Sequence, residues 1–127
     1  MKRLHTRYEV TAMSEYSVQQ HFEDRAPALR QTYDALLRLS RRFGEVVEEP
    51  KKTSIHLVAR SAFAGIALRK NELVLTIKSP ADIQSPRIRK REQVSARRWH
   101  LEVRLSDPRQ VDAEIERWIG QAFEISK

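Results

Sequence analysis

The 127-residue sequence contains no cysteine, and this absence removes several kinds of chemistry at once. There are no disulfides, no thiolate nucleophile and no cysteine-based zinc site. The chain suits a reducing compartment, and we expect a cytoplasmic location. Only Gly44, Gly65 and Gly120 are glycines, and because they are scattered the chain has no glycine-rich phosphate loop. Apolar runs extend over only a few residues, so we expect no membrane-spanning helix and no membrane partner.

Positive charge, by contrast, is plentiful and unevenly distributed. The formal net charge is +7. Residues 1–12 hold three basic side chains and one acidic, and residues 87–98 hold six basic and one acidic, while the rest of the chain sums to zero. A local cluster of this kind attracts phosphates or acidic surfaces. We call residues 87–98 the basic segment; the alternative is that its arginines are only the solvated side chains of a loop.

Capping residues and apolar spacing predict three helices. Ser17 begins a short one as an N-cap with a capping box. Pro27 lies in the first turn of a second helix, whose apolar stripe repeats every three and four residues until Gly44 ends it. Asp107 is predicted to cap the last helix, with Pro108 at its first position.

Between these helices the apolar period changes from 3.6 to 2, which is typical of strands. The pattern predicts strands over residues 45–49, 54–60, 62–69, 72–78 and 98–106, with the basic segment as a loop. The early turns are too short for parallel crossovers. The predicted class is therefore α+β: an antiparallel sheet of about five strands with the N-terminal and C-terminal helices packed on one face.

We expect residues 1–15 to be a loose N-terminal extension and residues 16–127 to form a single α+β domain. If the helices cover the face that carries Leu57, Leu75 and Leu101, the opposite face of the sheet is polar and rich in cations. The predicted ligand-binding residues belong to that face, to its surroundings and to the basic segment: Lys52, His56, Lys78, Arg87, Arg89, Lys90, Arg91, Arg97, Arg98 and His100.

No catalytic motif is present. The sequence contains no GxSxG, HExxH or EF-hand pattern. His56, His100 and Glu102 fall on strands and could supply two imidazoles and a carboxylate to a metal. Ordinary polar-face positions explain these three residues better. We therefore expect no metal, no cofactor and no catalytic residue.

Four segments of the chain resemble one known family. They are YSVQQHF, VVEEPKKTSIHLVARSAFAGIALRKNELVLTIKS, SPRIRKREQVSARRW and EVRLSDPRQVDAEIERWI. The run that contains them resembles the bacterial domain-of-unknown-function family numbered fifty-six fifty-five. The resemblance implies a small bacterial domain, and it implies no reaction, cofactor or catalytic residue.

The charge pattern favours a non-enzymatic module that binds an anionic ligand through the basic segment and the polar sheet face. The predicted ligands are nucleic acid, a phosphorylated small molecule or an acidic protein. One alternative is an enzyme of unknown reaction that uses His56 or His100 as its acid or base. Another is a homodimer built on an edge strand, with the basic segment serving only solubility.

Overall fold

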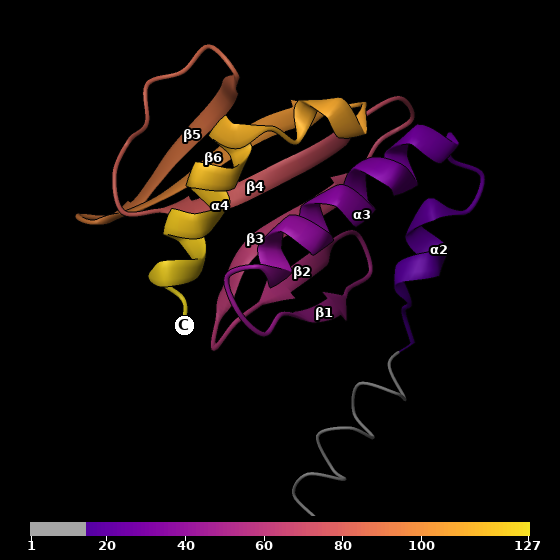
Figure 1. Ribbon diagram of the computed structural model, residues 1–127, viewed down its shortest axis with the longest axis horizontal. Coiled ribbons are helices and arrows are strands. Elements are labelled where there is room, and N and C mark those ends of the chain that lie inside the picture. The colour runs from indigo at the N-terminus through magenta and orange to yellow at the C-terminus, as the bar shows by residue number, and fades with distance from the viewer. Residues whose placement is uncertain (1–14) are drawn as a thin grey trace, which may run out of the picture.

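A six-stranded antiparallel sheet organises the computed structural model, which describes residues 15–127 (Figure 1). The strands are β1 (Val47–Pro50), β2 (Ile55–Val58), β3 (Ala62–Leu68), β4 (Leu73–Ser79), β5 (Ile88–Ser95) and β6 (Arg98–Leu105), in the spatial order β1-β2-β3-β4-β6-β5. The α+β class is confirmed, but the sheet has six strands and not five. The predicted extension, residues 1–15, lies outside the described residues except for its last residue.

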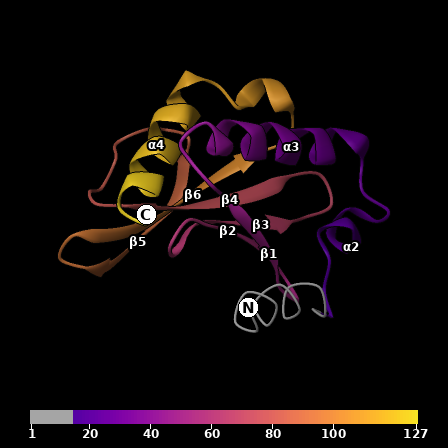
Figure 2. The same ribbon diagram turned by 60° about the horizontal axis from the view of Figure 1, so that its bottom comes forward.

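Helices α3 (Pro27–Arg41) and α4 (Ala113–Glu124) form a second layer on one face of this sheet (Figure 2). The short helix α2 (Val18–Phe22) lies beside β1 at the edge of the sheet, and a 3₁₀ turn η1 (Pro108–Gln110) precedes α4. The capping box at Ser17 and the position of Pro27 in the first turn of α3 are as predicted. Within residues 15–127 no helix combines the length and the apolar character that a membrane crossing requires.

The face of the sheet that the helices bury is the one that the sequence predicted. Leu57 and Leu75 are fully buried beneath the helices, and Leu101 is 2% exposed. The stripe of α4 meets them with Ile115 and Ile119, both fully buried. No helix formed by residues 15–127 covers the opposite surface of the sheet, and we call that surface the open face.

The last helix begins later than predicted. Asp107 does act as an N-cap, but for the 3₁₀ turn η1, where its side chain accepts a hydrogen bond from the backbone N–H of Arg109. Val111 then leaves the helical region with φ −84° and ψ 80°. Asp112 caps α4 by accepting from the N–H of Ile115. Asp107 and Asp112 are thus both N-caps: the first caps the 3₁₀ turn and the second caps the α-helix.

The end of α3 also differs from the prediction. The helix stops at Arg41, so Phe43 lies outside it and Gly44 is not its first residue beyond the cap. Gly44 has φ +155°, a conformation that side chains with a Cβ rarely adopt, and a Cβ there would lie 2.7 Å from the Phe123 ring. The glycine is required by a close approach to α4 rather than by a helix cap.

The largest correction concerns the basic segment, which is a strand and not a loop. Residues Ile88–Ser95 form β5, an edge strand that pairs with β6 in a hairpin. Only Ile88 of β5 is buried, and every other residue of the strand is exposed. The strand is therefore held by its backbone ladder with β6, and it has no apolar alternation from which the sequence could predict it.

Candidate functional site

The register of the sheet gathers polar side chains on the open face. His56 of β2 lies opposite Gly65 of β3, and Gly65 lies opposite Thr76 of β4. Two residues further along β4, Lys78 lies opposite His100 of β6. Because side chains alternate between the two faces of a strand, these residues share one surface.

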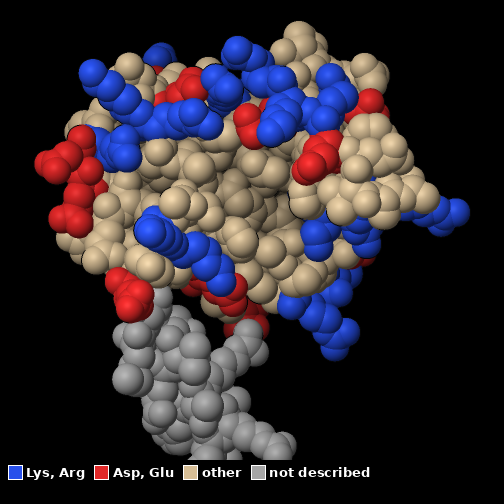
Figure 3. All heavy atoms as spheres, turned by 180° about the vertical axis from the view of Figure 1, so that it is seen from behind, with Lys and Arg blue, Asp and Glu red and all other residues tan. Residues whose placement is uncertain are grey.

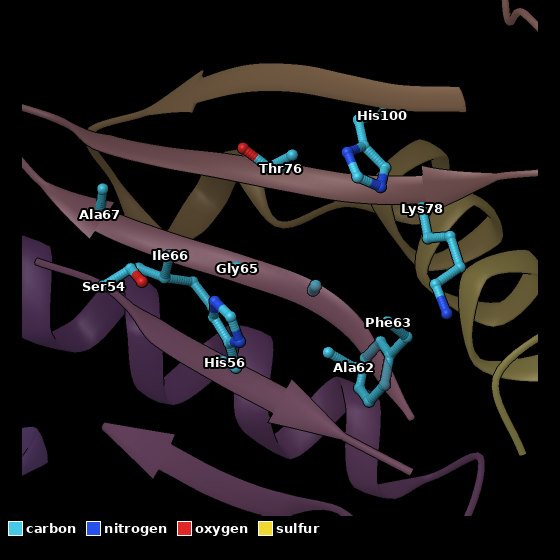
Figure 4. A pocket seen from close by; sticks show the side chains of 11 residues that line it. Ser54, His56, Ala62, Phe63, Gly65, Ile66, Ala67, Thr76, Lys78 and His100 are labelled. Carbon is cyan, nitrogen blue, oxygen red and sulfur yellow. The ribbon is translucent and has the colours of Figure 1, made fainter. Parts of the chain in front are cut away.

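A pocket of about 320 Å³ opens on this surface. Figure 3, which shows the molecule from behind Figure 1, displays a hollow of mostly uncharged atoms with Lys and Arg side chains around it. Figure 4 shows how the lining side chains lie about β3. The lining residues come from β2 and the residue before it, and from β3, β4 and β6: Ser54, His56, Ala62, Phe63, Ala64, Gly65, Ile66, Ala67, Thr76, Lys78 and His100.

Small residues of β3 create the hollow. Gly65 has no side chain, and a Cβ built on it would lie 3.7 Å from Cδ2 of the His56 imidazole, at ordinary contact distance. The ladder between β2 and β3 also shifts register, because Leu57 faces Ala64 while Val58 faces Ala62. Phe63 is thus the extra residue of a β-bulge.

The bulge determines the face of the sheet on which the Phe63 side chain lies. Its centroid lies 5.5 Å from that of Phe123 on α4, in an edge-to-face arrangement, and Phe63 is 1% exposed. The ring therefore packs into the core against α4 and does not project onto the open face.

Lys78 is the cation of the pocket. Its Nζ donates a hydrogen bond to Ser61 Oγ at 3.1 Å. Burial, and then the positive charge of Arg98, lower the pKa of Lys78. No carboxylate lines the pocket, and within the described residues Lys78 forms no ion pair. The ammonium group is thus partly desolvated, close to a second cation, and has no anionic partner.

The two histidines of the pocket are not coupled to Lys78. Within residues 15–127 no hydrogen bond joins His56, Lys78 and His100 to one another. His100 has a different neighbour, since its Nδ1 lies 3.9 Å from Glu92 Oε1 on β5. In the same range no three His, Asp or Glu side chains are grouped as a metal site would need. The alternative based on His56, His100 and Glu102 thus gains no support.

Arg87 of the basic segment is engaged within the chain. One of its terminal nitrogens lies 3.0 Å from Asp112 and 3.2 Å from Glu114, and the other donates to the carbonyl of Gln110 at 2.8 Å. Burial alone would raise the pKa of Asp112. The N–H of Ile115 and the guanidinium of Arg87 outweigh burial, and the pKa is lowered. Arg87 therefore fastens the start of β5 to the cap of α4.

Arg91 is engaged in a similar way. Its Nε lies 2.7 Å from Asp82, and its terminal nitrogen donates to the carbonyl of Ile83 at 2.9 Å. The link connects β5 to the loop that precedes it. Since Arg91 faces Leu101 across the ladder, it also lies on the side of the sheet that the helices cover.

The structure thus divides the predicted ligand-binding residues into groups. His56, Lys78 and His100 line the pocket, and Arg98 lies near enough to act on Lys78. Arg87 and Arg91 are held in ion pairs. The remaining four are exposed and away from the pocket lining: Lys52, Arg89, Lys90 and Arg97.

Sequence reasoning identified His56, Lys78 and His100 but not the other residues that line the pocket. Ser54 and Ser61 gave no signal, since serines are common beside turns. The sequence did contain a signal for the floor of the pocket, because Gly65 and Ala67 are small residues at alternate positions of one strand. Such a pair indicates a shallow surface on one face of a sheet.

Comparison with known proteins identifies a family and nothing more specific. A family model described as "Domain of unknown function (DUF5655)" matches residues 18–126. No curated protein matches the chain. No solved structure matches it either.

Proposed function

This chain belongs to the DUF5655 family, whose description states no function, and from the geometry of the pocket we propose that the domain is a non-enzymatic module that binds a small anionic ligand. The ligand enters the open-face pocket. Lys78 and His100 contact its charged group, and Arg98 adds positive potential at that end of the site.

One observation carries the proposal: among the described residues the pocket contains a lysine that forms no ion pair, and no carboxylate lines it. The ammonium group is partly desolvated and lies near Arg98, so two positive charges would attract a bound anion. Arg87 and Arg91 obtain an opposite charge from Asp112, Glu114 and Asp82 within the chain. Lys78 obtains none from the described residues, so a bound anion would supply it. Hydrogen bonds between charged groups are also stronger than neutral ones.

The lack of coupling between the pocket side chains favours binding over catalysis. A nucleophile and its base, or an acid and the group that orients it, normally lie within hydrogen-bonding distance of each other. His56, Lys78 and His100 share the lining of one pocket without such contacts. Each of the three side chains lies separately at the edge of the pocket, where it can contact a bound ligand.

A compact ligand fits this site better than a nucleic acid does. The pocket has the size of small-molecule sites, and its floor is largely apolar. The exposed cations Arg89, Lys90 and Arg97 lie outside the pocket. Their role is to raise the local concentration of anions near the open face.

The test is a titration of the ¹⁵N-labelled protein with inorganic phosphate, followed by two-dimensional NMR. We expect saturable shifts of the amides of Gly65, Thr76 and His100. Lys78→Gln removes the charge and keeps a polar side chain that is one bond shorter, and it should abolish these shifts. Lys90→Gln removes an exposed charge of the same sign and should preserve them. Shifts confined to β5, or shifts that persist in Lys78→Gln, would refute the proposal.

A further inference from the structure

The pocket is polarised along β3. At one end lie Lys78 and His100, which are direct neighbours across the ladder between β4 and β6. At the other end lie Ala67 and Ser54, which carry no charge. Ala67 lies opposite Val74 of β4, four residues along that strand from Lys78. At roughly 3.3 Å per residue the trough is therefore about 13 Å long.

The middle of the trough is a narrow slot with a bare floor. His56 and Thr76 occupy the strands on either side of Gly65, in the same cross-strand row. The backbones of β2 and β4 are two strand spacings apart, about 9.6 Å, and their side chains stand up from the sheet. Between these walls only the backbone of β3 forms the floor. A slot of this width accepts a flat ring and leaves little room for a bulky group.

The cationic end and the slot over Gly65 together specify a class of ligand. We propose that the pocket binds a phosphomonoester of a flat ring, with the phosphate between Lys78 and His100 and the ring over Gly65. This inference rests on the proposed function and adds the chemistry of the ligand to it. A phosphate is favoured over a carboxylate because it presents three oxygens and a larger charge to several donors.

Gly65 is the residue that admits the ring. A methyl group at this position would lie at ordinary contact distance from His56, so Gly65→Ala leaves the fold intact while it raises the floor of the slot. Val94→Ala is the control at an exposed position of β5 outside the pocket. It makes a change of similar size and leaves the slot and its charges as they are.

The experiment measures the affinity of three probes by titration: inorganic phosphate, phenyl phosphate and benzoate. The wild type should bind phenyl phosphate about tenfold more tightly than inorganic phosphate, because burial of a ring adds to the contact with phosphate. Gly65→Ala should lose this preference and keep its affinity for inorganic phosphate. Val94→Ala should keep both. Benzoate, which carries the ring with a single charge, should bind more weakly than phenyl phosphate.

Each other outcome has a definite reading. If the wild type binds phenyl phosphate and inorganic phosphate equally, the ring site is refuted and the anion site survives. The ring site is also refuted if Gly65→Ala keeps the preference. If benzoate binds as tightly as phenyl phosphate, the assignment to a phosphate is wrong. If none of the probes binds in the pocket, the proposed function fails and this inference fails with it.

Discussion

The hairpin of β5 and β6 and the pocket of the open face both carry positive charge, and they hold it in different ways. In the hairpin, Arg87 and Arg91 lie within 3.0 Å of carboxylates from distant parts of the chain. In the pocket, Lys78 has a serine hydroxyl as its partner and a cation as its neighbour. The hairpin has more charge in the sequence, but two of its arginines are held in ion pairs, whereas Lys78 forms none with the described residues.

The difference teaches how to interpret a basic cluster. The density of arginine in a sequence does not distinguish a guanidinium that ties two elements together from one that is free to meet a ligand. That distinction depends on where acidic residues from elsewhere in the chain arrive. Asp82 is nine residues before Arg91, and Asp112 is twenty-five residues after Arg87.

The largest effect should come from the strand that the two regions share. β6 pairs with β5 on one side, and on the other it carries His100 to the pocket. Leu101→Ala removes a buried side chain beneath both, and we expect it to lower the free energy of unfolding by about 2–5 kcal/mol. Urea denaturation measures this value. Both regions should lose stability together.

Glu102→Ala is the control, because Glu102 lies next in the chain on the open face. Its contact with Arg104 is long, at 4.0 Å, and Arg104 keeps a 3.1 Å contact with Glu72. The free energy of unfolding should change by no more than about 0.5 kcal/mol. A larger loss in Glu102→Ala than in Leu101→Ala would mean that the two faces of the sheet have been exchanged.

A smaller effect separates the structural arginines from the rest of the hairpin. Arg87→Ala leaves Asp112, Glu114 and the carbonyl of Gln110 without their donor. We expect a loss of about 1–2 kcal/mol in the free energy of unfolding, since the group is partly buried and its partners are charged. Arg89→Ala, at an exposed position of the same strand, should change it by less than about 0.5 kcal/mol. If the two variants change the free energy of unfolding equally, Arg87 does not have the structural role assigned to it.

The sequence predicted the parts of this molecule that follow a periodic pattern. The apolar alternation of Leu57, Leu75 and Leu101 indicated which face of the sheet is buried, and the structure agrees. It also placed His56, Lys78 and His100 on one surface, where they line one pocket. Alternation is a local property, so a single strand is enough to display it.

The parts that the sequence did not predict depend on pairing across long distances. β5 is exposed on all but one residue, so nothing in its own composition distinguishes it from a loop. Its existence depends on the ladder with β6. The pocket likewise depends on the register that brings His56 and Thr76 to either side of Gly65, and on the bulge at Phe63. Neither can be derived from one segment alone.

The exposed cations allow a further test of the comparison. Serine at Arg89, Lys90 and Arg97 together should lower the salt concentration at which the protein elutes from heparin, because fewer counterions are released on binding. The phosphate-induced NMR shifts of the pocket should remain. Lys78→Gln should show the reverse pattern, with heparin elution nearly unchanged and the shifts lost. If the triple variant also loses the pocket shifts, the two regions act as one site.

The smallest expected effect concerns the pH above which the pocket no longer binds an anion. Lys78 binds an anion only while it is protonated, so affinity for phosphate should fall as pH rises through the pKa of Lys78, which lies below the ordinary value of 10.5. Burial is the main cause of that lowering, and Arg98 is the second. Arg98→Ala removes the second cause, which raises the pKa of Lys78 and keeps the ammonium charged to a higher pH. The affinity at neutral pH should weaken because a nearby cation is lost, while the alkaline midpoint moves upward. Titrations with phosphate at a series of pH values measure both quantities. Arg97→Ala, at an exposed neighbouring position, should leave the alkaline midpoint unchanged, because Arg97 does not act on the pKa of Lys78. If the midpoint moves downward or stays fixed in Arg98→Ala, then Arg98 does not act on the lysine that binds the ligand.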